Sequence, residues 1–174
     1  MLSAKYPAII FLIIVIVALA LPIIYYPQLP ETVASHFNYK GEADGSMTKN
    51  SFIITEMATT LFLAFLLGSI AIFIPRMPKS FISMPNRDFW LNDENKEETI
   101  KLIQRFLFWF GSITLGFITL TFQETLRVNL EGSNKLDSNF WIYFILFMVL
   151  SSLYTIRFFL HFRKKNIPEQ AERT

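Results

Sequence analysis

The sequence contains no cysteine, and this absence excludes disulfide bonds, thiol nucleophiles and thiolate metal sites. Histidine occurs only twice in the 174 residues. A single histidine in a loop, without cysteine, falls short of the four ligands that a structural zinc site needs. We therefore expect no metal site and no cofactor.

The sequence also lacks a set of side chains that would serve as nucleophile, base and orienting group. Ser35 and His36 are neighbours along the chain, which is adjacency and not a catalytic triad. We expect no catalytic residues and a protein that is not an enzyme. The net charge of +2 is small, and the placement of its cations has a simpler explanation than a nucleic-acid partner.

Charged residues are scarce, at 17% of the chain, whereas hydrophobic residues reach 52% and include 19 phenylalanines. The apolar residues gather in four runs, each long enough to cross a hydrocarbon core of about 30 Å as a helix. The runs cover residues 7–26, 52–75, 103–123 and 140–162. The sequence predicts an all-α integral membrane protein with four transmembrane helices in an antiparallel bundle. We expect one domain over residues 1–166, followed by a short polar tail at 167–174.

Lysine and arginine are distributed unevenly between the loops, and cytoplasmic loops are the ones that usually concentrate them. The predicted loop 76–102 and its borders carry six of these residues, whereas the predicted loop 27–51 carries two. The C-terminal tail is also basic. We expect both termini and loop 76–102 in the cytoplasm, and loop 27–51 outside.

Local signals suggest how these loops fold. Pro30 would suit the first turn of a short helix over Glu31–Phe37, because a proline there sacrifices no needed donor. Asn50 or Ser51 would cap the second long helix. A helix is expected to run from about Asp93 without interruption into the third apolar run.

Polar and small residues at a spacing of three to four form one stripe on each of two predicted helices. The stripes comprise Glu56, Thr60, Ala64 and Gly68 on the second helix, and Ser112, Gly116, Thr119 and Gln123 on the third. Small residues allow close helix packing in lipid, so we expect the stripes to face each other. Glu56 and Gln123 would then meet near the outer surface, beside Glu124 and below the loop that contains His36.

An ionisable residue inside a membrane helix usually faces a partner or a wet cavity. Glu56 has two interpretations: a shallow acid that reaches the lipid headgroups, or a structural or ligand-binding contact with His36, Lys49 or Arg127. The small members of the stripes have a simpler explanation in ordinary helix packing.

The loop 27–51 is the most specific polar stretch of the chain. Its candidate binding residues are His36, Asn38, Gly41, Asp44 and Gly45. Their mixed nitrogen and oxygen donors do not follow the alternating oxygen pattern of a calcium loop. On the inner side, Asn86, Phe89 and Trp90 are candidates for an interfacial anchor or an interaction site.

Two blocks of residues carry a family resemblance. The outer loop has the series Leu29-Pro30, His36-Phe37-Asn38, Gly41-Glu42, Asp44-Gly45 and Lys49, and the inner loop has Pro85-Asn86-Arg87-Asp88-Phe89-Trp90-Leu91. Together they resemble a bacterial membrane domain of unknown function, related to the N-terminal module of SdpI-like toxin-immunity proteins. The resemblance implies a helical protein of the bacterial cytoplasmic membrane, and an immunity or signalling role for some relatives. Full-length immunity proteins of that group have six spans, whereas this chain has four.

The expected function is a non-catalytic membrane protein, in which the outer loop meets an extracellular peptide, such as a toxin, or a membrane partner subunit. A sensor that signals to a cytoplasmic regulator through the inner loop is a related hypothesis. The alternative is a transporter accessory subunit or a small oligomeric transporter. The lipid bilayer is a partner in each case.

Overall fold

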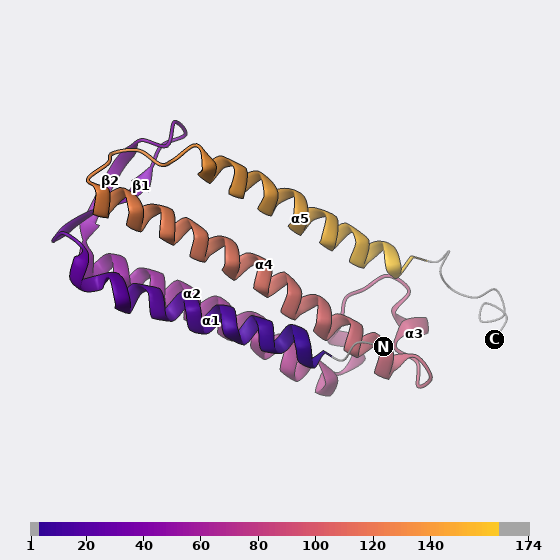
Figure 1. Cartoon of the computed structure of the whole chain (residues 1–174). Coiled ribbons are helices and arrows are strands. Elements are labelled where there is room, and N and C mark those ends of the chain that lie inside the picture. Colours follow the sequence, from indigo (N-terminus) through magenta and orange to yellow (C-terminus); the bar gives the residue numbers. More distant parts are fainter. Residues whose placement is uncertain (1–3, 164–174) are drawn as a thin grey trace.

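The computed structural model describes residues 4–163, which are mostly helical (Figure 1). Four helices are long and apolar enough to span a membrane: α1 (Lys5–Tyr25), α2 (Lys49–Phe73), α4 (Lys96–Glu131) and α5 (Asn139–His161). They indicate a multi-pass membrane protein. The predicted tail at 167–174 lies outside the described residues.

The four long helices lie side by side, and short elements cover their two ends (Figure 1). A hairpin of strands β1 (Thr32–Phe37) and β2 (Ala43–Thr48) covers one end, here called the hairpin end. The short helix α3 (Arg87–Trp90) lies at the other, here called the α3 end. Three 3₁₀ turns complete the connections, at Tyr26–Gln28, Ile74–Arg76 and Lys79–Phe81. Helix α4 is central, because it packs against α1, α2 and α5.

The expectation of an all-α protein with a short helix over Glu31–Phe37 is wrong. Residues 32–37 form β1, which pairs antiparallel with β2. Val33 is fully buried while Thr32 is exposed, so the segment points alternate side chains to opposite faces, as a strand does. Pairing with residues six to sixteen positions farther along the chain outweighed the local helix-start signal of Pro30.

Two helix boundaries also differ from prediction. Helix α2 begins at Lys49 and is capped by Thr48, whose hydroxyl accepts a hydrogen bond from the Ser51 N–H at 3.2 Å. The expected caps Asn50 and Ser51 therefore lie inside the helix. Helix α4 begins at Lys96, close to the expected start, but continues to Glu131, eight residues past the predicted span. This extension brings its last turns against β1.

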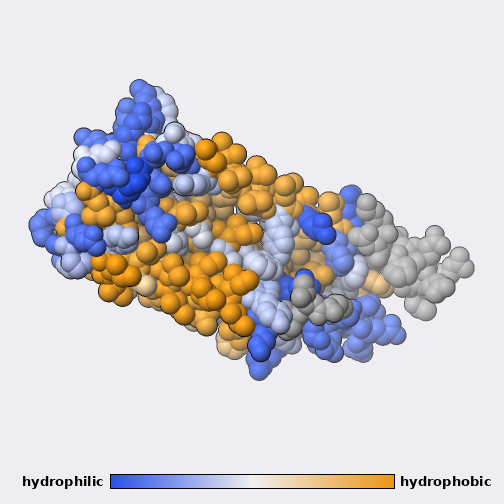
Figure 2. Space-filling view, viewed as in Figure 1, coloured by the Kyte–Doolittle hydropathy of each residue, from blue (hydrophilic) through white to orange (hydrophobic). Residues whose placement is uncertain are grey.

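Apolar side chains cover the long helices between two polar ends (Figure 2). The contrast is sharpest on α5, where no residue is buried and large apolar side chains point outward along the whole helix. A helix that is apolar all round and this exposed is suited to a lipid environment.

The two predicted stripes do not meet directly in the middle of the bundle. The Phe11 ring of α1 lies against Gly68 of the α2 stripe and against Gly111, the neighbour of Ser112 in the α4 stripe. A Cβ placed on Gly68 would lie 3.5 Å from the ring, and one placed on Gly111 would lie 2.7 Å from it. Gly116, an expected contact, instead faces α1 across a cavity lined by Ile13 and Val17. Small residues thus bring helices close together, as expected in lipid, but through an aromatic ring of a third helix.

Candidate functional site

The tip of the hairpin is shaped by Asn38. Its Oδ1 accepts hydrogen bonds from the N–H groups of Lys40 at 2.8 Å and Glu42 at 3.1 Å. Gly41 has a φ of +78°, a left-handed conformation that favours glycine. Two residues of the predicted binding set therefore have a structural role, which is to close the turn.

His36 and Asp44 face each other across the two strands, and His36 Nδ1 is hydrogen-bonded to Asp44 Oδ1. The strand register is irregular here, and a Cβ placed on Gly45 would lie 2.9 Å from the Cβ of His36. Gly45 thus lets the strands approach beside the histidine. The His36 side chain is 74% exposed, so this pair lies on the outer surface of the hairpin.

Lys49 closes the base of the hairpin. Its Nζ lies 2.7 Å from Glu31 Oε1, and its backbone N–H donates to the Glu31 carbonyl at 3.0 Å. The ammonium also lies 5.2 Å from the centre of the Tyr26 ring, a cation–π distance. The Lys49 ammonium therefore interacts with Glu31 and Tyr26 at the start of α2, and not with Glu56.

The hairpin is attached to α4 by Asn129, a residue that sequence reasoning missed. Asn129 Oδ1 accepts from the Ala34 N–H at 2.7 Å, and its Nδ2 donates to the Ala34 carbonyl at 2.9 Å. Its amide therefore pairs with β1 as a neighbouring strand would. The sequence offered little indication of this role, because Asn129 lies beyond the predicted end of the third span.

The α4–α5 connection adds a second attachment along the hairpin. The Ala43 N–H donates to the Asn134 carbonyl at 2.8 Å, and the Leu136 N–H donates to the Gly41 carbonyl at 2.9 Å. Buried apolar residues fill the space beneath the hairpin: Leu29, Val33, Phe52, Ile53, Phe122 and Leu126. The hairpin is therefore held firmly as a cover over the helix ends.

A cavity of about 290 Å³ lies below this cover, between the hairpin, α2 and α4. Glu56 contributes one wall, and its Oε1 is buried without a hydrogen-bond partner among the described residues. The other lining residues are Ser35, Met47, Phe52, Thr55, Phe117, Ile118, Thr121, Phe122 and Thr125. Glu56 lies seven residues after the start of α2, about 10 Å along the axis at 1.5 Å per residue. It is therefore deeper in the helix than the sequence indicated.

The cations expected to contact Glu56 have other partners. His36 pairs with Asp44 and Lys49 with Glu31. Arg127 lies 2.9 Å from Glu124 and 3.2 Å from Glu131. A carboxyl oxygen without a hydrogen bond or ion pair in a mostly apolar cavity is energetically unfavourable. Glu56 is therefore the strongest candidate in the described chain for contact with a bound molecule or partner protein.

The predicted meeting of Glu56 with Gln123 and Glu124 is wrong. Gln123 is exposed and lines a different cavity, together with Tyr25 of α1. Glu124 forms an ion pair with Arg127. The faces of α4 decide this outcome: Thr121 and Thr125 point to the Glu56 cavity, and Gln123 points toward α1.

Arg127 also approaches the start of α5, because its Nη2 lies 3.8 Å from Asp137 Oδ2. The backbone N–H of Asn139 donates to the Asp137 carboxylate at 2.9 Å. This hydrogen bond, helped by the Ser138 hydroxyl and the nearby guanidinium, lowers the pKa of Asp137 below its ordinary value. The hairpin end thus carries a network of charges that joins the last turns of α4 to the residues just before α5.

At the α3 end, the inner block of the resemblance also has a structural role. Asn86 has a φ of +52°, and its Nδ2 donates to the Phe162 carbonyl at 2.8 Å. Trp90 packs against the rings of His161 and Phe162, with ring centres 5.3 and 5.4 Å away, and Phe89 lies edge-on to Trp90. The block therefore fastens the loop before α4 to the end of α5.

Residues 13–56 match the model of a family described as a domain of unknown function (DUF1648). The matched stretch begins in α1, contains the whole hairpin and ends at Glu56. No curated protein and no solved structure matches the chain. The hairpin and Glu56 therefore lie together in the stretch that is similar to this family of unknown function.

Proposed function

We propose that the chain is a non-catalytic membrane interaction protein, which uses the cavity beneath its hairpin to bind a peptide segment of an extracellular or membrane partner. The four helices form an antiparallel bundle with both termini in the cytoplasm and the hairpin outside. The excess of lysine and arginine in the loop at the α3 end supports this orientation. The resemblance of the two loop blocks supports a bacterial cytoplasmic membrane.

The observation that carries this proposal is Glu56, which lines the cavity and whose buried Oε1 has no hydrogen-bond partner among the described residues. A carboxylate in such surroundings is stabilised by a charged or strong hydrogen-bond donor, such as a lysine, arginine or N-terminal amine. The aromatic lining of Phe52, Phe117 and Phe122 suits apolar side chains beside that donor. A segment with one cationic group among apolar residues fits both features.

Helix α4 offers a physical route from such a contact to the inner loop. It contacts β1 at the hairpin end and the turn Ile74–Arg76 at the α3 end. Gln104 Nε2 also donates to the Ala71 carbonyl at 2.8 Å, which ties α4 to α2. Immunity against a secreted peptide and signalling to a cytoplasmic regulator are both compatible with this arrangement.

The proposal is tested by photo-crosslinking in cells that contain the full-length chain. A photoreactive amino acid at position 35 lies on the cavity wall, whereas one at position 39 lies on the exposed hairpin tip. We expect a discrete adduct from position 35 that the Glu56→Gln substitution abolishes. Glu131→Gln is the matched control, because Glu131 is an exposed acid at the same end.

An adduct at position 35 that persists in the Glu56→Gln variant would contradict a role for this carboxylate. Equal adducts from positions 35 and 39 would indicate random encounters rather than binding in the cavity. Survival of cells challenged with secreted peptide toxins then distinguishes immunity from another interaction.

A second candidate function is supported by α5. This helix packs mainly against α4 and leaves its remaining faces exposed. A subunit of a larger membrane assembly, as in a transporter accessory protein or a small oligomeric transporter, would cover such a face. The mass of the complex extracted under mild conditions tests this idea, and a strictly monomeric particle without other subunits would contradict it.

A further inference from the structure

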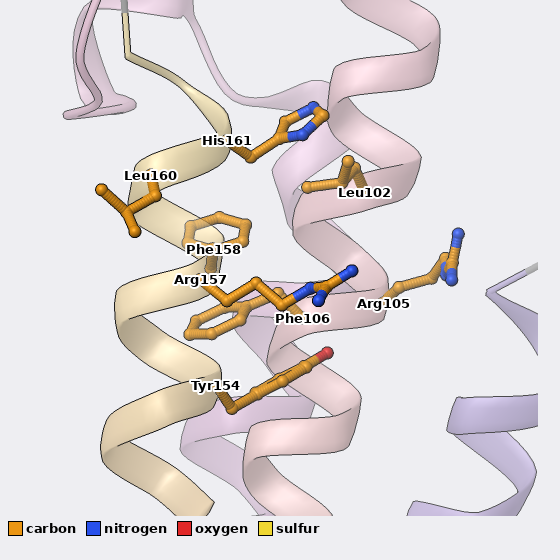
Figure 3. A pocket seen from close by; sticks show the side chains of 8 residues that line it. All are labelled: Leu102, Arg105, Phe106, Tyr154, Arg157, Phe158, Leu160 and His161. Atoms are coloured by element: carbon orange, nitrogen blue, oxygen red, sulfur yellow. The ribbon is translucent and has the colours of Figure 1, made fainter.

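A second cavity lies between α4 and α5 near the α3 end, remote from the hairpin. Its volume is about 520 Å³, and Figure 3 shows its eight lining residues: Leu102, Arg105, Phe106, Tyr154, Arg157, Phe158, Leu160 and His161. Arg157 reaches from α5 toward α4, and the Tyr154 hydroxyl points the same way (Figure 3). Arg105 also lines the cavity from α4, but its guanidinium points away from Arg157 and Tyr154 (Figure 3).

Arg157 brings a positive charge into this cavity, and Arg105 adds a second one nearby on α4. Within residues 4–163, neither Arg105 nor Arg157 has a carboxylate within 4.0 Å. Arg157 lies four residues before the end of α5, about 6 Å from it at 1.5 Å per residue. That depth corresponds to the boundary between hydrocarbon tails and headgroups when the helix spans a bilayer.

We propose that this cavity binds the phosphate group of an anionic phospholipid in the leaflet at the α3 end. Guanidinium groups bind phosphate with several charge-assisted hydrogen bonds, and the Tyr154 hydroxyl supplies a further donor. Basic pockets between transmembrane helices are known to hold anionic lipid headgroups.

The surroundings of the cavity favour a lipid over a soluble phosphate. Leu160 is 43% exposed and lies on the side of α5 that faces away from α4 (Figure 3). Leu102, Phe106 and Phe158 add apolar walls to the cavity. If Arg157 holds the phosphate of a phospholipid, the acyl chains of that lipid can lie along these apolar side chains. A soluble phosphate has no acyl chains and would gain no contact energy there.

The test uses the full-length chain reconstituted in bilayers of equal parts phosphatidylglycerol and phosphatidylcholine. After gentle extraction, native mass spectrometry measures how much phosphatidylglycerol stays bound. We expect selective retention that falls about tenfold in the Arg157→Gln variant, which loses a charge-assisted contact. Arg157→Lys should retain an intermediate amount because it keeps the charge without the planar fork.

The matched control is Arg76→Gln, since Arg76 is an exposed arginine at the same end but outside the cavity. If this control loses as much lipid as Arg157→Gln, the retention reflects general surface charge and the proposed site is wrong. Efficient competition by soluble glycerol phosphate would likewise overturn the lipid assignment. Should Arg157→Gln fail to fold, Tyr154→Phe removes the second proposed donor, and unchanged retention in that variant and in Arg157→Lys would overturn the site.

Discussion

The Asn129 amide is the clearest point at which a single side chain attaches the hairpin to the helices. Its Oδ1 and Nδ2 form hydrogen bonds of 2.7 and 2.9 Å with the N–H and carbonyl of Ala34. A third bond, of 2.8 Å, joins Nδ2 to the Thr125 carbonyl within α4 and orients the amide. We predict that Asn129→Ala loosens the hairpin while the four long helices stay folded.

The expected magnitude follows from the two bonds between elements. Each hydrogen bond contributes about 0.5–1.5 kcal/mol net, so their loss should destabilise the attachment by about 2 kcal/mol. Water can replace part of the loss because the site is only partly buried. Since 1.4 kcal/mol corresponds to a factor of ten, local opening at Ala34 should become about 30-fold more frequent.

Amide hydrogen exchange of the Ala34 N–H in detergent or nanodiscs measures this opening. Asn134→Ala is the matched control, because it is the backbone carbonyl of Asn134 and not its side chain that bonds to the Ala43 N–H. The reasoning is refuted if Ala34 exchanges at the same rate in the Asn129→Ala variant and in the control. Loss of helix content on circular dichroism would show that the effect is global and not local.

Two further predictions concern packing and pH. Gly111→Ala should destabilise the fold by about 1–3 kcal/mol and so lower the melting temperature, because the new Cβ would lie 2.7 Å from the Phe11 ring. In the contrasting variant Gly116→Ala, the new Cβ meets nothing within 4 Å, so this substitution should be neutral or stabilising. The Asn139 N–H lowers the pKa of Asp137 below its ordinary value, so the stability that this hydrogen bond contributes is present above the ordinary pKa and is lost as the pH falls through the lower, folded-state pKa. Asp137→Asn should remove this part of the acid response in a thermal unfolding series, and an unchanged pH profile would contradict it.

The predicted spans agree with the long helices because a run of about 20 apolar residues has few other options in a chain of this size. The hairpin was missed because residues 31–37 carry a helix-start signal, while their pairing partner lies farther along the chain. Glu56 was singled out as unusual from the sequence, since a carboxylate within an apolar run is visible there. Its surroundings were not visible, because they depend on which face of α4 lies toward α2.

The two loop blocks show the same distinction. Their order of residues was recognisable as specific, and we interpreted it as a binding surface. In the structure, Asn38, Gly41 and Gly45 form the hairpin, and Asn86 and Trp90 fasten the inner loop to α5. A specific pattern in sequence therefore reflected the geometry of the loops as well as any binding.

The sequence by itself determined the membrane-spanning helices, because hydrophobic length is a local property. It also determined the absence of thiol chemistry and the unusual position of Glu56. Only the tertiary structure decided what the hairpin covers, which cations are already paired, and that Glu56 Oε1 has no hydrogen-bond partner among the described residues. These features arise from contacts between residues distant along the chain, such as Asn129 with Ala34, and local patterns carry no information about which of them form.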